Sequence, residues 1–471
     1  MKKIFTLKTN FFIVITLLLI NNGYSQCFVT LTNKYNHNIG IKTNGTLWGW
    51  GWGDWGQLSN TTDFNEPSPI QIGTSNNWQF AVAGYYNAFS IKTDGSLWGT
   101  GRNDFGQLGI GNANIVENLT QIGTATNWKQ IAPADSFTIG LRLDGSLWGW
   151  GFNDYYQVGD GTLTTRYSPV QLGTATDWKM IASCAARQGF ALKNNGTLWG
   201  WGSNLTGMLG DSTVQTVPVP TQLNTDTDWK SITLGYAHIL AIKNNGTLWS
   251  WGGGDNGECG DNLPLFYFRD TPQQVGTDTW KVVAGGYFFS FGIKNNGTLW
   301  AWGKNDVGQL GDGTTTNQAH PVQIGTDTNW STVAAGYQHV VALKTNGAIY
   351  TWGNNISGQL GNGTTTNTTT PAAITITGCA LANDGFSKEN NSFTISPNPA
   401  KSELNLNYNG NEVINTIIIY DITGKEVFKT QPVTTTTLMA TFSIAELQSG
   451  SYLVVLKNND KTVVSKQLVK E

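Results

Sequence analysis

One phrase of eleven residues recurs seven times along the chain, at intervals of 50 or 51 residues. The first copy is IKTNGTLWGWG from Ile41, and the last is LKTNGAIYTWG from Leu343. The 471 residues would otherwise allow about three domains of roughly 150 residues each. So regular a period excludes three independent domains, and it predicts one repeat architecture.

Each copy of the phrase contains a two-residue turn signal. A tight hairpin needs positive φ at both central residues, and Asn-Gly or Asp-Gly tolerates that best. The seven pairs are Asn44-Gly45, Asp94-Gly95, Asp144-Gly145, Asn195-Gly196, Asn245-Gly246, Asn296-Gly297 and Asn346-Gly347. The repeat is therefore predicted to contain a hairpin at this point.

Four short strands account for each repeat. In the fifth copy we expect strands at residues 231–234, 239–243, 247–251 and 271–275. Trp48 and Trp50 in the third strand point to one side of the sheet, and glycine on the other side allows the next sheet to approach. The 20 Trp and 57 Gly of the chain are largely repeats of this strand and its turn. We predict an all-β chain in which a seven-bladed β-propeller precedes a small β-sandwich, since a closed ring leaves no long exposed edge.

The two ends of the chain lie outside the repeats. Lys2, Lys3 and Lys8, followed by about ten apolar or Thr residues, predict a signal peptide at residues 1–25. A buried N-terminal helix, or a lipoprotein acylated at Cys27, is the alternative. The propeller is expected at residues 26–379, a polar linker at 380–392, and a further β domain at 393–471. Export implies an oxidising destination and a mature chain without a transmembrane segment.

Ring closure brings two cysteines to one junction. Cys27 precedes Phe28, which stands where later repeats begin with Trp, and Cys379 ends the seventh repeat after an outer strand near Pro371 to Ile376. We predict a Cys27–Cys379 disulfide, with two unpaired cysteines as the alternative. Cys184 and Cys259 are interpreted as small buried hydrophobic residues.

Several phrases then resemble those of the regulator of chromosome condensation repeat family. They are the Ala335-Gly336-Tyr337 to His339 segment, the Trp352-Gly353-Asn354 segment and the Gly358-Gln359-Leu360-Gly361 segment, with a similar copy at residues 303–311. The resemblance covers roughly residues 27–379, and it implies a propeller. Members of the family include nuclear exchange factors and secreted binders. The propeller has 17 Lys and Arg against 22 Asp and Glu, a net charge of 17 − 22 = −5, which argues against nucleic acid and nuclear exchange activity.

The C-terminal segment resembles the sorting domain of the type IX secretion system of Bacteroidetes. The resemblance rests on Ser396-Pro397-Asn398-Pro399, on the phrase from Ile417 to Phe428 and on the ending KQLVKE. It implies that the secretion machinery is a partner and that the chain is secreted or attached to the outer surface. An ordinary adhesion module is the alternative.

Aromatic and histidine side chains gather at equivalent repeat positions on one predicted face. In a propeller, the turn between strands one and two and the loop between strands three and four emerge together. The candidate binding residues are Tyr35, Tyr85, Tyr236, Tyr287, Tyr337, His37, His238, His339, Trp52, Trp55, Phe105, Tyr155, Tyr156, Phe266, Tyr267 and Phe268. Rigid aromatics make good recognition anchors, although the tyrosines could instead pack the loops.

No cofactor or metal is expected. Three histidines converging on the axis could bind a metal, but each is better explained by a hydrogen bond within its own blade. Asp306 and Asp312 lie in loops without calcium-loop spacing. The sequence carries no known catalytic motif.

These observations favour an exported scaffold that binds a protein or a glycan through an aromatic loop face. A hydrolase acting on polysaccharide is the first alternative. It needs two neighbouring carboxylates, and Asp135, which replaces the repeat tyrosine, is the one candidate. A purely structural surface protein is the second alternative.

Overall fold

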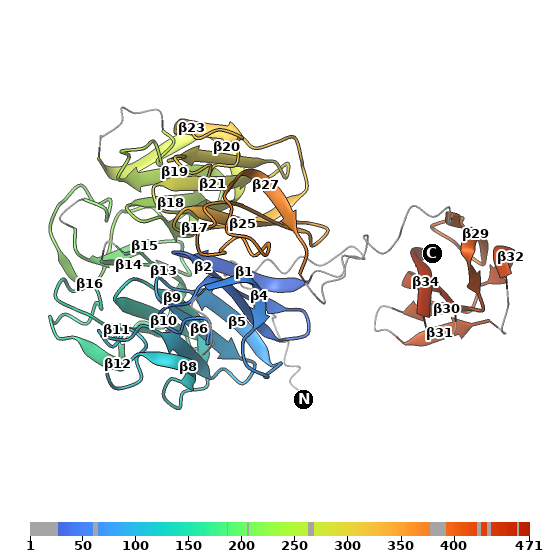
Figure 1. Ribbon diagram of the computed structural model, residues 1–471, viewed down its shortest axis with the longest axis horizontal. Coiled ribbons are helices and arrows are strands. Elements are labelled where there is room, and N and C mark those ends of the chain that lie inside the picture. The colour runs from blue at the N-terminus through green and yellow to red at the C-terminus, as the bar shows by residue number, and fades with distance from the viewer. Residues whose placement is uncertain are drawn as a thin grey trace, which may run out of the picture. The chain divides into compact units, whose positions relative to one another are not determined.

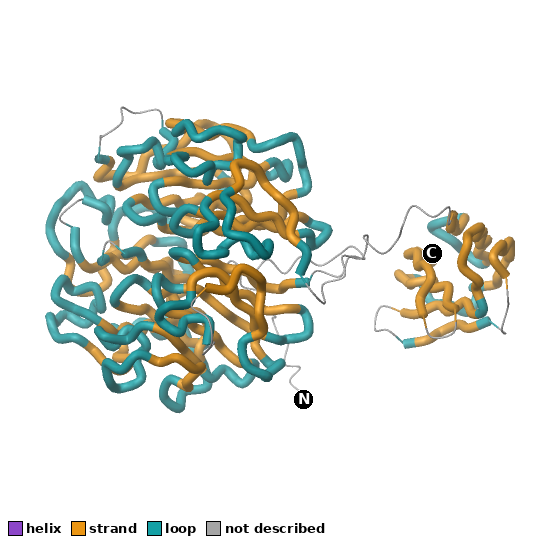
Figure 2. The backbone as a smooth tube through the Cα atoms, viewed as in Figure 1, coloured by secondary structure: helices purple, strands orange, loops and turns teal. Residues whose placement is uncertain are grey.

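The computed structural model describes residues 27–59, 65–185, 187–204, 207–261, 268–376, 392–421, 425–430, 435–458 and 461–471. Within these ranges the chain consists of strands and loops (Figure 2). None of the described segments forms a helix long and apolar enough to cross a membrane. The chain divides between Leu381 and Ala382 into two compact units. The predicted signal peptide lies outside the described residues.

The first unit contains seven consecutive four-stranded blades (Figure 1). Blades one to three are β1 (Phe28–Lys34), β2 (His37–Lys42), β3 (Leu47–Trp52), β4 (Asn65–Gln71); β5 (Trp78–Ala83), β6 (Asn87–Lys92), β7 (Leu97–Gly101), β8 (Val116–Gln121); β9 (Trp128–Pro133), β10 (Phe137–Arg142), β11 (Leu147–Gly151), β12 (Arg166–Gln171). Blades four and five are β13 (Trp178–Ser183), β14 (Gln188–Lys193), β15 (Leu198–Gly202), β16 (Val217–Gln222); β17 (Trp229–Leu234), β18 (His238–Lys243), β19 (Thr247–Gly252) and the first part of β20 (Arg269–Gly285). Blades six and seven are the rest of β20 with β21 (Phe289–Lys294), β22 (Leu299–Gly303), β23 (Gln318–Gln323); β24 (Trp330–Ala335), β25 (His339–Lys344), β26 (Ile349–Gly353), β27 (Thr368–Ile374).

The predicted hairpin turn is present, and the rest of the phrase supports it. Gly45 has φ of 78°, in the left-handed region. The Asn44 Oδ1 atom accepts hydrogen bonds from the Thr46 backbone N–H and hydroxyl, at 3.2 and 2.7 Å. The Thr46 hydroxyl in turn accepts one from the Trp48 indole at 2.8 Å. The Asn-Gly-Thr-Leu-Trp sequence therefore forms one hydrogen-bonded unit.

One junction between blades differs from the others. β20 runs without interruption from the outer edge of blade five to the inner edge of blade six, so that β17 to β23 form a single seven-stranded sheet. The connecting sequence VGTDTW at residues 275–280 is one residue shorter than IGTATNW at residues 122–128. The shorter connection removes the bend that separates strands at the other junctions.

Tryptophan side chains connect each of blades three to seven to the preceding blade. The Trp352 indole donates a hydrogen bond to the Gln309 carbonyl oxygen at 3.0 Å, and Trp302 does the same to Glu258 at 2.8 Å. A Cβ atom added at Gly311 would lie 2.6 Å from the Trp352 Nε1 atom. The expected contact between indole and glycine is therefore real, but the glycine belongs to the preceding blade's loop. Gly49 in the third strand instead faces Ile72 and Leu58.

The ring closes through backbone and side-chain hydrogen bonds between the seventh and first blades, among them the bond of 2.7 Å from the Tyr337 N–H to the Tyr35 carbonyl oxygen. β27 pairs with β26 inside the seventh blade. The outer strand near Pro371 to Ile376 therefore belongs to the seventh blade's own sheet, and it does not pair with the first blade. Asn33 of β1 donates to the Ala334 carbonyl oxygen of β24 at 3.2 Å. In Figure 1 the blue first blade lies beside the orange seventh blade. Cys379 lies outside the described residues, so the Cys27–Cys379 disulfide stays a prediction.

The second unit is a β-sandwich. One sheet has the order β28 (Ser392–Ser396), β29 (Glu403–Ile414), β32 (Thr435–Ser443); the other has β31 (Glu426–Lys429), β30 (Thr416–Asp421), β33 (Gly450–Asn458), β34 (Lys461–Lys470). Leu404, Leu406 and Ile417 lie in its core. The Val469 backbone N–H donates to the Asn398 side-chain oxygen at 2.8 Å. The Ser-Pro-Asn-Pro segment thus holds the last strand.

Candidate binding face

Five tyrosines at one repeat position meet at one end of the ring. Tyr35, Tyr85, Tyr236, Tyr287 and Tyr337 occupy the turns between the first and second strands of their blades, and we call them the tyrosine collar. The ring centroids of Tyr287 and Tyr337 are 4.1 Å apart, and those of Tyr35 and Tyr337 are 4.9 Å apart. The collar is therefore a connected cluster, which includes both the first and the seventh blade.

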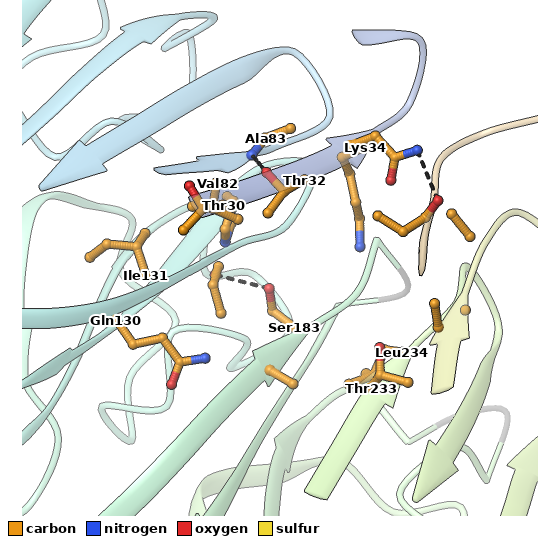
Figure 3. Close-up of a pocket in the computed structure, with 18 of the residues that line it drawn as sticks. Thr30, Thr32, Lys34, Val82, Ala83, Gln130, Ile131, Ser183, Thr233 and Leu234 are labelled. Carbon is orange, nitrogen blue, oxygen red and sulfur yellow. Dashed lines mark hydrogen bonds between the residues drawn. The ribbon is translucent and has the colours of Figure 1, made fainter. Parts of the chain in front are cut away.

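The collar lies at one end of a central cavity of about 190 Å³, which the innermost strands line. Lys34 extends its side chain into this cavity from β1, whereas Ser183 and Thr32 bond neighbouring blades to one another (Figure 3). Every other blade has Gly, Ala or Cys at the position of Lys34. Burial lowers the pKa of Lys34, and its ammonium lies 5.3 Å from the centre of the Tyr85 ring. None of the described residues that line the cavity is acidic.

Asp135 interrupts the collar in blade three. Its carboxylate lies 3.5 Å from the Arg102 guanidinium, which also binds Asp104 at 2.8 Å. Burial raises the pKa of Asp135, while the Arg102 charge lowers it. Tyr85 is buried, and both burial and the Asp135 charge raise its pKa. The described structure thus gives Asp135 an arginine partner.

A groove opens beside the collar, between blades one and two. It has a volume of about 600 Å³, and it is lined by Tyr35, Trp52, Asp54, Trp55, Tyr86, Arg102, Ile115 and Glu117. We call this set the groove. The Trp52 ring lies 5.5 Å from Tyr35 and 5.6 Å from Tyr86. The turn between strands one and two and the loop after strand three therefore emerge on one face, as predicted, and we call that face the loop face.

Charges and backbone strain both mark the groove. The Arg102 guanidinium lies 5.4 Å from the Trp55 ring centre and 5.2 Å from that of Tyr86, within cation–π range. Burial and a hydrogen bond with Tyr35 raise the pKa of Tyr86. Tyr35 has φ of 46°, a left-handed conformation that non-glycine residues seldom adopt. Strained residues of this kind cluster at functional sites.

The structure corrects the prediction that three histidines lie on the binding face. His37, His238 and His339 are completely buried, so their rings do not reach its surface. His238 Nε2 lies 2.8 Å from the Ser290 hydroxyl of the next blade, and His339 Nε2 lies 3.1 Å from Asn38 Oδ1 of the first blade. The expected hydrogen bond within the same blade is therefore wrong for these two residues, which join neighbouring blades. Among the described residues no cluster of His, Cys, Asp or Glu could hold a metal.

The remaining predicted residues lie in other loops. Phe105, Tyr155 and Tyr156 are half-buried in the loops after the third strands of blades two and three. Arg102 lies over Phe105 at 5.3 Å, and Arg187 lies over Tyr155 at 4.1 Å. Phe268 is exposed, whereas Phe266 and Tyr267 lie outside the described residues.

Sequence reasoning missed several members of the groove. They are Asp54, Tyr86, Arg102, Ile115 and Glu117. One signal could have found two of them, because Tyr86 and Arg102 stand where blade seven has Gln338 and Asn354. Departures from the repeat mark positions that the fold itself does not fix.

Comparison with protein families assigns both units. The model of the regulator of chromosome condensation (RCC1) repeat matches residues 44–91, 144–192, 195–242, 296–343 and 346–379. A second model of the same repeat matches residues 80–107, 229–258, 280–309 and 330–359. The model of the secretion system C-terminal sorting domain matches residues 394–471. Together the matches cover most of the described chain.

Solved structures are similar in fold. Human WBSCR16 is 18% identical with a TM-score of 0.62, over 69% of this chain and 93% of that one. Yeast RCC1 (Prp20) bound to Kap60 is 19% identical with a TM-score of 0.63, over 75% and 86%. Prp20p from Saccharomyces cerevisiae is 19% identical with a TM-score of 0.62, over 76% and 90%. No curated protein matches the sequence.

Proposed function

The chain belongs to the regulator of chromosome condensation repeat family and ends in a secretion sorting domain, and from this premise we propose that it is a binding protein of the cell exterior. The sorting domain indicates export by type IX secretion to the cell surface or the extracellular space. We infer that the partner is a protein or a glycan, and that the propeller binds it through the loop face.

One observation carries this proposal, namely aromatic side chains that the repeat does not require. Trp52 stands where blades four to seven have Ser203, Gly253, Lys304 and Asn354. All these blades form the same four strands, so a large ring at this place is not needed for folding. Trp52 nevertheless lies half-exposed beside Tyr35 and Tyr86. Half-exposed aromatics on a rigid support are typical of recognition surfaces.

The chemistry of Asp135 favours binding over catalysis. A glycoside hydrolase needs one carboxyl group that remains protonated and a second one opposite it. Burial raises the pKa of Asp135, but the Arg102 guanidinium lies 3.5 Å from Asp135 and 2.8 Å from Asp104, so one arginine engages both carboxylates. We therefore propose a protein without hydrolase activity. Release of reducing ends from polysaccharide by the full chain, abolished by Asp135→Asn, would contradict this.

The test of the proposed function measures capture of envelope proteins and glycans by the full chain. The chain is applied to a glycan array and to detergent-solubilised cell-envelope proteins, beside a Tyr236→Ala/Tyr337→Ala variant and a Trp52→Asn/Trp55→Asn variant. We expect at least one of the two variants to lose the captured partner. A Leu143→Asp variant changes the opposite, hairpin end of the blades. If both loop-face variants retain the captured partner and Leu143→Asp loses it, the site lies elsewhere and the proposal is overturned. Leu143 is exposed beside the Asp144-Gly145 turn.

A further inference from the structure

The groove has the size of a small-molecule site. Its volume of about 600 Å³ falls within the roughly 300–1,000 Å³ typical of ligand pockets. A protein partner usually covers about 800 Å² of surface through 20–30 residues, whereas eight residues line this groove. These dimensions suit a few sugar rings better than a folded partner.

The lining combines flat aromatic surface with planar polar groups. Trp52, Trp55 and Tyr86 are half-buried, so part of each ring remains accessible. The face of an aromatic ring is negative, and it attracts the weakly positive C–H hydrogens of a pyranose. Asp54 and Glu117 are exposed at the same groove, where their carboxylates can accept hydrogen bonds from ring hydroxyls. Ile115 is the single aliphatic residue in the lining.

The charge of the groove selects among glycans. Among the described residues that line the groove, Asp54 and Glu117 are opposed by Arg102 alone, and Arg102 already contacts Asp104 and Asp135. A uronic acid or a sulfated sugar would meet an excess of negative charge. A cationic ligand would compete with Arg102, whose guanidinium already lies over Trp55 and Tyr86. An uncharged ligand avoids both the repulsion by Asp54 and Glu117 and the competition with Arg102.

We propose that the groove between blades one and two binds a neutral glycan, with Trp52 and Trp55 as stacking platforms and Asp54 and Glu117 as hydroxyl acceptors. The inference rests on the proposed function, of which it names the ligand class. The internal repeat supports it, because Trp55 stands where blades five to seven have Asn256, Val307 and Ser357.

The repeat also supplies variants that should fold. Asn354 occupies the position of Trp52 in blade seven, and Asn256 occupies the position of Trp55 in blade five. Trp52→Asn and Trp55→Asn therefore introduce side chains that the same loop already accepts elsewhere. Tyr167→Asn is the matched control, since Tyr167 is an exposed aromatic on β12 and is not in the groove lining.

The experiment is calorimetric titration of the full chain with defined hexasaccharides. The neutral probes are the gluco-, manno- and xylo-hexaoses and the N-acetylglucosamine hexamer; the charged probes are hexagalacturonate and a lysine-rich peptide. We expect one neutral hexamer to bind. Trp52→Asn and Trp55→Asn should each weaken this binding about tenfold or more, which corresponds to a loss of about 1.4 kcal/mol of binding free energy. Tyr167→Asn should leave the affinity unchanged. Thermal unfolding of each variant checks that it is folded.

Three results would overturn the inference. They are the absence of binding by every neutral probe, binding only by a charged probe, and neutral binding that survives both tryptophan substitutions. Failure here is distinguishable from failure of the proposed function. A protein captured from the envelope fraction and lost in the Tyr236→Ala/Tyr337→Ala variant would keep the loop face as a binding surface while removing the glycan from it.

Discussion

The Asn38 side-chain amide of the first blade donates a hydrogen bond of 2.9 Å to the Gln359 carbonyl oxygen of the seventh. In blades two, three, four, five and six the equivalent carbonyl oxygen accepts a hydrogen bond from a tryptophan indole of the following blade, as Gln309 does from Trp352. The Trp50 indole has no such partner in the described structure. Asn38 thus makes the closing contact that tryptophan makes elsewhere in the ring.

We expect Asn38→Ala to lower the free energy of unfolding by about 1–3 kcal/mol, because it leaves a buried carbonyl and the His339 ring without this partner. Urea unfolding followed by tryptophan fluorescence measures the change. Asn118→Ala is the control, since Asn118 is exposed on β8. Equal midpoints for the two variants would show that the closing hydrogen bond contributes nothing.

The predicted Cys27–Cys379 disulfide would close the same junction covalently. In the loop-entropy model a bridge of this span stabilises by about 4–5 kcal/mol. Cys184 and Cys259 are buried thiols that form no disulfide, so denatured, unreduced protein should label at two thiols, and reduced protein at four. Cys27→Ser, Cys379→Ser and the double variant should lose the same stability, because each removes the same bond. Labelling of four thiols without reductant would refute the bridge.

Much of the fold follows from the repeat itself. The Asn-Gly turns and the alternation of Leu47, Trp48 and Gly49 determine strands locally, so the blades could be predicted from one copy and extended to seven. The long strand β20 could not, because it depends on one residue missing from the segment between Gly276 and Trp280. A single deletion changes the path of the chain without changing the repeat pattern.

The contacts between copies were less predictable. Periodicity shows that His238 and His339 are equivalent, but it does not show whether their partner lies in the same blade or in the next one. The structure gives Ser290 and Asn38, each one blade further on. The groove was missed for a similar reason, since Trp52, Tyr86 and Glu117 come from two blades. Equivalence between repeats is a sequence property, whereas adjacency depends on how the blades pack.

The buried histidines predict loss of stability in acid. Burial lowers the pKa of His238 to about 3 and that of His37 to about 4, from 6.5. A lowered folded-state pKa gives stability that is present above pH 6.5 and is lost as the pH falls toward the folded value. We expect each histidine to destabilise the fold by roughly 2–3 kcal/mol at pH 4 relative to pH 7.

His238→Gln should reduce this acid sensitivity, because Gln188 occupies the equivalent place in blade four. Urea midpoints between pH 7 and pH 4 measure it. His320→Gln, at an exposed residue of β23, should leave the pH dependence as it is in the parent chain. Parallel pH profiles for His238→Gln and the parent chain would contradict the assignment.

The buried Glu258 side chain predicts that stability falls as the pH rises, which is opposite to the effect of the histidines. Five other blades have glutamine at this position, for example Gln309. Like Gln309, Glu258 accepts a hydrogen bond from a backbone N–H through one side-chain oxygen, and the donor is Asn256 at 2.8 Å. The second oxygen is buried without a partner in the described structure, whereas the Gln309 amide donates to Asp306 at 2.9 Å. Burial raises the pKa of Glu258 to about 7 from 4.5. A protonated Glu258 therefore resembles the glutamine of its neighbours.

A raised folded-state pKa gives stability that is complete below about pH 4.5 and is lost as the pH rises through about 7. Glu258→Gln should remove this loss, and it should raise the free energy of unfolding at pH 8 by roughly 2–3 kcal/mol. At pH 4.5 the variant and the parent chain should be nearly equal, because both then carry a neutral side chain there. Urea unfolding at the two pH values distinguishes this from a general packing effect, which would change stability equally at both. A variant that gains nothing at pH 8 would show that Glu258 remains ionised within the fold, held by Arg269 and solvent.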